Sequence, residues 1–216
     1  MANLSDLGFS KGIIAETIVS TYNFDGKPNA APMGVYMEDE QNLTINLFTS
    51  SITYKNIKTN GCAVVNLTND IEAYYKTTFK DTNLYGTLPS GWFQKSKSVN
   101  APKLIFADAT IDVLINNFES VSVEKIKAKL KVKHLEAKLQ YPQVHNRAMS
   151  QTLEAIIHAT RVKTLLNDDK EQNNVHKLLE TIADCYDVVN RVAPNSSYSL
   201  IMDYLMKRIR SWQEQK

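Results

Sequence analysis

Residues 43–67 read LTINLFTSSITYKNIKTNGCAVVNL, and the rest of the chain is best understood outward from them. Apolar side chains alternate from Leu43 to Phe48, which is the period of a half-buried strand. A hydroxyl cluster, a short polar segment, a glycine and a second apolar run follow, at residues 49–51, 52–57, 61 and 62–67. The pattern predicts a strand, a loop, one or two turns of helix and a second strand.

The hydroxyl cluster Thr49-Ser50-Ser51, with Thr53 just after it, admits two interpretations. Hydroxyl side chains at a helix start lie beside the unpaired backbone N–H groups of the first turn, and a phosphate monoester needs such donors. Ser51 or Thr53 can equally cap the helix, because Ser and Thr are preferred at that position with or without a ligand. The cluster taken alone favours capping.

The composition is that of an ordinary soluble globular protein. Of the 216 residues, 43% are hydrophobic and 22% are charged, and the formal net charge is +2. A charge this close to neutral indicates neither nucleic acid nor an anionic membrane as a partner.

The cysteines and histidines bear on the compartment and on metal binding. Cys62 and Cys185 lie in apolar patterns, which predicts buried thiols in a reducing compartment. The four histidines are scattered and the cysteines are unpaired, so no metal site is predicted. No signal-peptide core and no apolar run of membrane-spanning length is present, so we expect a cytoplasmic protein.

The chain before residue 43 predicts a β-hairpin. Residues 12–21 are rich in β-branched types, and Asp25-Gly26 is a strong turn signal between two strand-like runs. The return strand, residues 29–36, consists mostly of small residues around Pro32, which cannot donate to a sheet ladder. We therefore expect this strand to break or kink at a sheet edge. A flat ligand lying against it and a bulged edge strand without a ligand both fit.

These segments together resemble the FMN-binding split barrel of the flavin reductase-like superfamily. The resemblance rests on Gly12-Ile-Ile-Ala-Glu-Thr17, Asp25-Gly-Lys-Pro-Asn-Ala-Ala-Pro-Met-Gly-Val35, Thr49-Ser-Ser-Ile-Thr-Tyr-Lys-Asn56 and Gly61-Cys-Ala-Val-Val-Asn-Leu67. It implies that the small-residue strand lies along the isoalloxazine ring, flanked by Asn29, Ala31, Pro32 and Met33. It also implies that the hydroxyl loop meets the phosphate or ribityl chain through Thr49, Ser50, Ser51 and Thr53, with Asn56 close behind. Neutral donors that converge on a dianion are a recognised way to hold it.

The segment after residue 67 predicts a helix and then an irregular loop. Residues 69–79 have helical spacing, with Asp70 as a cap. Residues 80–102 are rich in Gly, Pro, Ser and Asn and predict an irregular loop. The pair Trp92-Phe93 inside it either packs back onto the barrel or covers a pocket as a lid.

Two further strands are predicted, over residues 104–115 and 126–139. The second carries a row of alternating lysines and slips in register near His134, which suggests a bulge. Such a row is usually a solvated strand face that discourages edge pairing. It can also form a basic rim that attracts an anionic cofactor.

From Val144 onward the pattern is helical, with three amphipathic helices at about 146–166, 175–192 and 194–212. The first helix gathers four polar residues at i+3 and i+4 steps: Arg147, Glu154, His158 and Arg161. An exposed, salt-bridged helix face explains them, and a functional site is the alternative.

The segment His145-Asn-Arg-Ala-Met-Ser-Gln-Thr-Leu-Glu-Ala-Ile-Ile-His-Ala-Thr-Arg161 resembles a more specific group. This is the uncharacterised domain-of-unknown-function 447 family, mainly archaeal, which joins a flavin split barrel to a C-terminal helical region. Its Asn-Arg-Ala start and His-Ala-Thr-Arg end are distinctive, and the resemblance covers nearly the whole chain. Where the family usually has a glycine soon after Asn-Arg-Ala, this chain has Met149-Ser150, which puts any close backbone approach there in doubt.

We therefore expect an α+β protein, with a split β-barrel of about six strands in residues 1–142 and a C-terminal helical domain in residues 143–216. The resemblance implies FMN as a non-covalent cofactor and a homodimer, since such barrels commonly place the flavin between two subunits. It further implies an FMN-dependent oxidoreductase of unknown substrate, with NAD(P)H or another small molecule as electron partner. Arg147 is the candidate for a charged phosphate partner, since guanidinium binds phosphate oxygens bidentately.

Other functions fit the same sequence. A non-catalytic flavin carrier on this fold would keep the phosphate loop, and a structural module would bind no ligand. A haem or pyridoxal-phosphate protein on the same barrel is a third alternative, and His134 or His145 as an axial ligand would be the sign of haem. No catalytic triad, paired-carboxylate motif or Walker-type loop indicates another chemistry, and no catalytic residue is assigned.

Overall fold

The computed structural model describes residues 2–139 and 144–215, which form two compact units. The first unit contains residues 2–68 and 79–139, and the second contains residues 69–78 and 144–215. The predicted boundary between residues 142 and 143 lies outside the described residues. One short segment of the predicted barrel domain, residues 69–78, groups with the helical unit.

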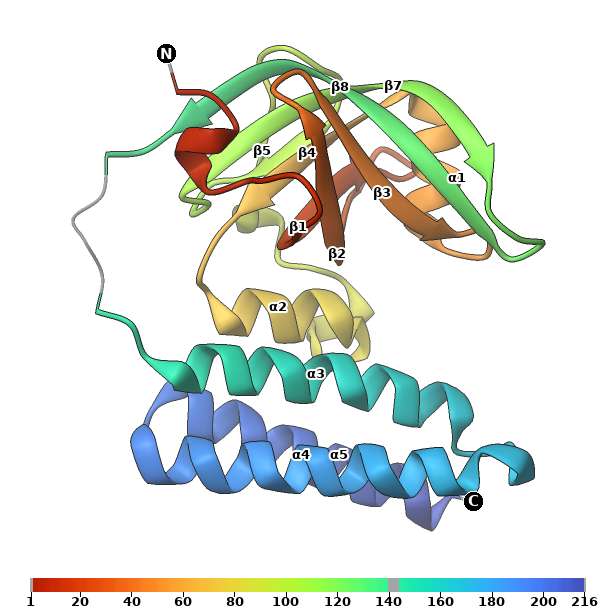
Figure 1. Ribbon diagram of the computed structural model, residues 1–216, viewed down its shortest axis with the longest axis vertical. Helices are drawn as coiled ribbons and strands as arrows, with labels where there is room; N and C mark the ends of the chain where they lie inside the picture. The colour runs from red at the N-terminus through yellow and green to blue at the C-terminus, as the bar shows by residue number, and fades with distance from the viewer. Residues whose placement is uncertain (1, 140–143, 216) are drawn as a thin grey trace. The chain divides into compact units, whose positions relative to one another are not determined.

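The first unit is a closed barrel with the strand order β1-β2-β3-β8-β7-β4, each neighbouring pair antiparallel (Figure 1). Its strands are β1 Ile14–Tyr22, β2 Pro28–Asp39, β3 Asn42–Phe48, β4 Cys62–Leu67, β7 Ala109–Ser120 and β8 Lys125–Ala137. This barrel, followed in the chain by helices, confirms the predicted fold class.

The hairpin of β1 and β2 forms as predicted, with Tyr22 paired to Pro28 and Gly26 at φ +76° in the turn. The predicted break at Pro32 is wrong, because β2 runs without interruption and Pro32 pairs with Ile18. The prediction of an edge is confirmed for residues 28–34, which pair with β1 alone in the described ladders. A proline is tolerated in a strand with a free edge, since no ladder there needs its N–H.

The barrel is open along part of one seam. The ladder between β2 and β3 begins at the Asn42 end and stops at the pair Val35 and Ile45. Beyond it, residues 28–34 of β2 and 46–48 of β3 are not paired with each other, although both strands continue. We call these two unpaired backbone stretches the open edge.

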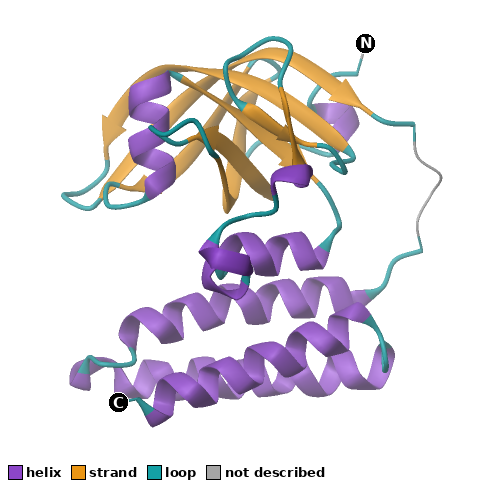
Figure 2. Ribbon diagram, turned by 180° about the vertical axis from the view of Figure 1, so that it is seen from behind, coloured by secondary structure: helices purple, strands orange, loops and turns teal. Residues whose placement is uncertain are grey.

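Helix α1, Ile52–Asn60, follows β3 directly and ends at Gly61, which has φ +69°. The helix contacts β1, β2, β3 and β4 and lies along the barrel (Figure 2). Its Ile57 is fully buried and joins the apolar barrel core. The N-terminal lead-in is also part of this core, because Leu4 and Phe9 are buried in it.

Residues 80–104 are more ordered than the predicted irregular loop. They form three short 3-10 turns and a two-stranded sheet: η2 Lys80–Thr82, η3 Leu84–Gly86, η4 Ser90–Trp92, β5 Phe93–Lys95 and β6 Pro102–Leu104. The strand predicted to start at residue 104 starts at Ala109, because residue 104 belongs to β6. Trp92 packs edge-on against Phe106, with ring centroids 5.2 Å apart, which supports packing rather than a lid.

A buried amide fastens β6 to the barrel. Asn66 on β4 is fully buried, and its Oδ1 accepts from Leu104 N at 2.8 Å. Its Nδ2 donates to Ile18 O and to Ser20 Oγ, both at 2.8 Å, and Ser20 Oγ donates to Pro102 O at 2.6 Å. Every polar group in this network is thereby satisfied away from water.

The lysine row lies on β8, which pairs with both β3 and β7. The interpretation of the row as protection of a sheet edge is therefore wrong. Lys127 pairs with Glu38 at 3.2 Å and Lys129 with Glu119 at 2.6 Å. The register shifts beside His134, which confirms the predicted bulge.

The second unit is helical. It consists of α2 Ile71–Thr78, α3 Arg147–Leu165, η5 Asp169–Glu171, α4 Gln172–Val192 and α5 Ser197–Glu214, so the three predicted C-terminal helices are confirmed. Helix α3 packs against α2, α4 and α5. Asp70 caps α2 through the N–H groups of Glu72 and Ala73, also as predicted. In the described ranges, each helix is too short or too polar to cross a membrane.

We predict that Asn66→Ala lowers the free energy of unfolding by about 3 kcal/mol or more. The substitution leaves buried backbone groups without hydrogen-bond partners, and each such group costs about 1–3 kcal/mol. Chemical denaturation followed by circular dichroism measures this change. Asn100→Ala is the matched control, since Asn100 is exposed. Equal stability of the two variants would contradict the assigned role of the Asn66 amide.

Candidate functional site

The hydroxyl loop lies where β3 passes into α1. Ser51 is the N-cap: its Oγ accepts from Tyr54 N at 3.1 Å and donates to Phe48 O at 2.7 Å. Thr49 N donates to Glu124 O at 2.9 Å, which ties the loop to the β7–β8 turn. The capping interpretation is therefore confirmed for Ser51, and its hydroxyl hydrogen is already used.

Other donors of this loop remain available to a ligand. The backbone N–H groups of Ser50, Ile52 and Thr53 have no hydrogen-bond partner in the part of the chain that the structure describes. The Ser50 side chain is exposed, whereas Thr53 is buried. Free N–H groups at the start of a helix favour an anion, helped by the positive end of the helix dipole.

The small-residue strand presents its side chains alternately to two faces. Val35 is fully buried in the barrel core, so Asn29, Ala31 and Met33 lie on the inward face. Pro32 lies on the outward face. Ala31, Pro32 and Met33 are each half-buried, and Asn29 is buried.

The strand register places the loop and this strand at the same end of the open edge. Val35 pairs with Ile45, and each step from Val35 toward Asn29 corresponds to one step from Ile45 toward the loop. Continued past the last pair, this register sets residues 49–51 level with residues 29–31. Two of the predicted groups of site residues therefore lie toward the same end of the two strands.

A cluster of side chains joins α1 to the β1–β2 hairpin behind this opening. Asn56 Nδ2 donates to Thr21 Oγ1 at 2.9 Å and to Asn23 Oδ1 at 2.8 Å. Asn29 Nδ2 donates to the same Thr21 Oγ1 at 3.4 Å. We call Thr21, Asn23, Asn29 and Asn56, with the lysine described next, the amide cluster. Asn56 thus positions α1, with both amide hydrogens engaged.

Lys80 is the member of the amide cluster that the sequence did not indicate. Its Nζ donates to Asn29 Oδ1, and burial lowers the pKa of its ammonium group. No carboxylate lies within ion-pair distance of it among the described residues. The contact joins residues 51 positions apart, and the lysine follows a helix in a polar segment, so no local pattern marks it.

The other predicted polar residues are not members of this cluster. Arg147 is exposed at the first turn of α3 in the helical unit, and its role toward a phosphate stays a prediction. His134 and His145 are exposed. His158 Nε2 lies 3.0 Å from Glu154 Oε1, which is the i, i+4 contact that the polar-face interpretation expects of this pair.

The two cysteines are chemically quiet. Both are buried and free, as the sequence predicted, and burial raises the pKa of each thiol. Thiols of this kind are poor nucleophiles at neutral pH. The described residues contain no group of three or more His, Cys, Asp or Glu able to hold a metal ion.

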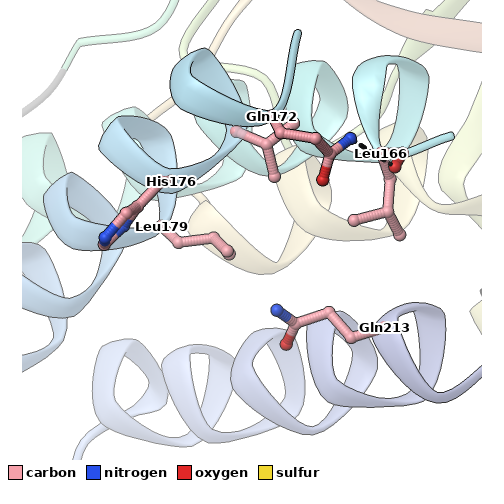
Figure 3. Close-up of a pocket in the computed structure, with 6 residues that line it drawn as sticks. Leu166, Gln172, His176, Leu179 and Gln213 are labelled. Carbon is pink, nitrogen blue, oxygen red and sulfur yellow. Dashed lines mark hydrogen bonds between the residues drawn. The ribbon is translucent and has the colours of Figure 1, made fainter. Parts of the chain in front are cut away.

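The helical unit has a pocket of about 330 Å³ of its own (Figure 3). It is lined by Leu166, Gln172, Val175, His176, Leu179 and Gln213. The Gln172 amide already donates to Leu166 O at 3.1 Å and Asp168 O at 2.8 Å. With few convergent polar groups, this pocket is a weaker candidate than the open edge.

Comparisons with known proteins give two family models and a similar solved structure. A model described as the N-terminal domain of a protein of unknown function, DUF447, matches residues 15–156, and a second DUF447 model matches residues 146–207. The crystal structure of an FMN-bound DUF447 protein from Methanosarcina mazei is 24% identical, with a TM-score of 0.77. The match covers 94% of this chain and 98% of that one.

More distant structures are also similar. A 2-nitrobenzoate 2-nitroreductase from Pseudomonas fluorescens is 17% identical over 64% of this chain and 73% of its own, with a TM-score of 0.48. A flavoredoxin from Methanosarcina acetivorans is 18% identical over 60% of this chain and 72% of its own, with a TM-score of 0.47. No curated protein sequence matches the chain.

We predict that Ser51→Ala destabilises the first unit by about 1 kcal/mol, the usual effect of losing an N-cap side chain. Thermal unfolding measures the difference. Ser50→Ala removes a neighbouring exposed hydroxyl that caps nothing, and it should leave the unfolding temperature unchanged. Two variants of equal stability would show that the Ser51 cap contributes nothing.

Proposed function

The chain belongs to the DUF447 family, whose models match its barrel and its helices, and on that premise we propose that it is a flavoprotein that binds FMN non-covalently at the open edge. The observation that carries the proposal is that the β2–β3 ladder stops at Val35 and Ile45 while both strands continue. This leaves the small-residue strand unpaired near a loop with unpaired backbone N–H donors. The FMN in the related archaeal protein supports the choice of cofactor.

The residues present fit the parts of FMN. Ser50, Ile52 and Thr53 would hold the phosphate through their backbone N–H groups, and Ser50 also through its exposed hydroxyl. Thr49 would join them by giving up the 3.4 Å hydrogen bond from its hydroxyl to Glu124 O, and Thr53 has a buried hydroxyl. Asn29, Ala31, Pro32 and Met33 would flank the ring, since small and half-buried side chains let a flat group approach the backbone. Ser51 and Asn56 would act by holding α1 in place.

We further propose an FMN-dependent oxidoreductase of the flavin reductase type, with an unidentified electron acceptor and NAD(P)H or another small molecule as reductant. FMN, when bound, supplies the electron-transfer chemistry, and the protein binds and orients it. The domain assignment follows: residues 1–142 would form the FMN-binding domain and residues 143–216 a helical domain. A cytoplasmic location, as the sequence predicted, completes the proposal.

A homodimer is part of the proposal. Large apolar side chains are exposed beside the hydroxyl loop: Phe48 at 53%, Ile52 at 52% and Val123 at 97%. Phe48 pairs with Lys125 across the β3–β8 ladder, and Val123 lies in the turn just before β8. The end of β3 and the β7–β8 turn therefore meet next to the hydroxyl loop. Exposed apolar groups of this size beside a ligand site support its burial by a second copy.

We predict that the purified protein binds added FMN and takes on its visible absorption. Ser50→Asp should weaken FMN binding at least about tenfold, because a carboxylate in the loop repels the phosphate and occupies its donors. Fluorescence quenching of FMN measures the dissociation constant. Ser98→Asp adds the same charge at an exposed position of the same unit and should leave binding unchanged.

Two results would count against this assignment. A wild-type protein that leaves FMN free in solution would remove the proposed function. Tight FMN binding by Ser50→Asp would instead show that FMN is the cofactor but that its phosphate does not bind at the hydroxyl loop.

The oxidoreductase proposal has its own measurement. We predict that the FMN-loaded protein oxidises NADH or NADPH when an electron acceptor is supplied, followed by loss of absorbance at the nicotinamide band. A protein that holds FMN but leaves both nucleotides unoxidised would be a flavin carrier, or would use another reductant.

A further inference from the structure

Lys80 is a half-buried cation of the first unit with no carboxylate within ion-pair distance among the described residues. The one hydrogen-bond partner of its ammonium group among the described residues is Asn29 Oδ1, which is a neutral oxygen. An ammonium group removed from water is costly unless a counter-charge is near, and the lowered pKa reflects that cost. By contrast, Lys103, which is buried, has Glu136 as its ion-pair partner at 2.5 Å.

The position of Lys80 links it to the proposed phosphate loop. It contacts Asn29, and Asn29 shares the Thr21 hydroxyl with Asn56 of α1. Asn29 also lies at the end of the open edge that the register sets level with residues 49–51. One continuous hydrogen-bonded cluster therefore connects the lysine to the helix whose first turn offers its free N–H groups.

The charge of the phosphate also favours a cation at this site. The donors identified at the loop are neutral, and a phosphate monoester carries a charge of about −1.5 to −2 near pH 7. Of the other lysines beside the open edge and the loop, Lys127 pairs with Glu38, whereas Lys55 and Lys125 are exposed to solvent. Arg147, the cation that the sequence suggested, is exposed on the helical unit.

Resting on the proposed FMN site, we infer that Lys80 is the cationic partner of the FMN phosphate, presented to it by Asn29. The assignment supplies an anion for the half-buried Lys80 ammonium, which has no carboxylate within ion-pair distance among the described residues. It also gives Asn29 a role distinct from lining the ring: the Asn29 amide oxygen orients the lysine without neutralising it.

A pair of variants separates this role from a purely structural one. Lys80→Gln keeps a hydrogen-bond donor for Asn29 and removes the charge. Asn29→Asp keeps the contact and neutralises the lysine internally. We expect each to weaken FMN binding by about tenfold to a hundredfold, the range for a charge-assisted hydrogen bond. Lys80→Gln should leave riboflavin binding nearly unchanged, because riboflavin lacks the phosphate. Lys80→Arg should retain most of the FMN affinity.

The controls address folding, charge and the competing cation. Lys133→Gln removes the same charge from an exposed position of β8 and should leave FMN binding unchanged. Asn29→Asp creates an ion pair but loses the Asn29 Nδ2 donor to Thr21 Oγ1, so thermal unfolding is measured for it and for Lys80→Gln to show that both variants are folded. Arg147→Gln is measured alongside, as the alternative phosphate partner.

Three outcomes would overturn the inference. FMN affinity could be unchanged in Lys80→Gln, or FMN and riboflavin could weaken equally, or Arg147→Gln alone could lower FMN affinity. Each leaves the wild-type measurement intact, so a failure of this inference is distinct from a failure of FMN binding itself, which the wild-type protein reports.

Discussion

The β2–β3 ladder ends at Val35 and Ile45 while both strands continue, and the candidate site depends on this one interruption. A fully paired seam would continue the ladder along residues 28–34 of β2 and leave no unpaired backbone there. The interruption instead leaves a strand edge of unpaired backbone, which can accept a ligand where an ordinary barrel has none. Pro32 is compatible with that edge because it has no N–H to leave unsatisfied.

The elements around the opening are held by buried polar contacts as well as by apolar packing. Asn56 holds α1 against the hairpin through Thr21, and Asn66 holds β6 on the other side of β1. Such contacts are directional, so they define position more narrowly than apolar burial does. The donors of the hydroxyl loop are consequently presented by a rigid frame, which favours binding because less freedom is lost.

Much of the fold could be predicted from local patterns. The hairpin at Asp25-Gly26, the helix after Ser51 and the three C-terminal helices follow from periodicity and caps, which depend on neighbouring residues. The short strands β5 and β6 could not be predicted, because their three-residue runs carry no period. Lys80 could not be predicted as a site residue for a similar reason, since its role depends on a contact with Asn29, which is far away in the chain. The hydroxyl loop was recognisable, but the sequence could not show that Ser51 uses its hydroxyl as a cap.

Helix α2 lies between β4 and β7 in the chain, yet its packing partners within the helical unit are α3 and α5. During synthesis on the ribosome, α2 emerges before β7 and β8, whereas α5 emerges after residue 197. Of these two partners, α3 begins 69 residues after the end of α2 and α5 begins 119 residues after it, so the buried Ile71 and Tyr74 of α2 are made well before either helix can cover them. A nascent chain stalled in that interval would present an apolar helix to chaperones.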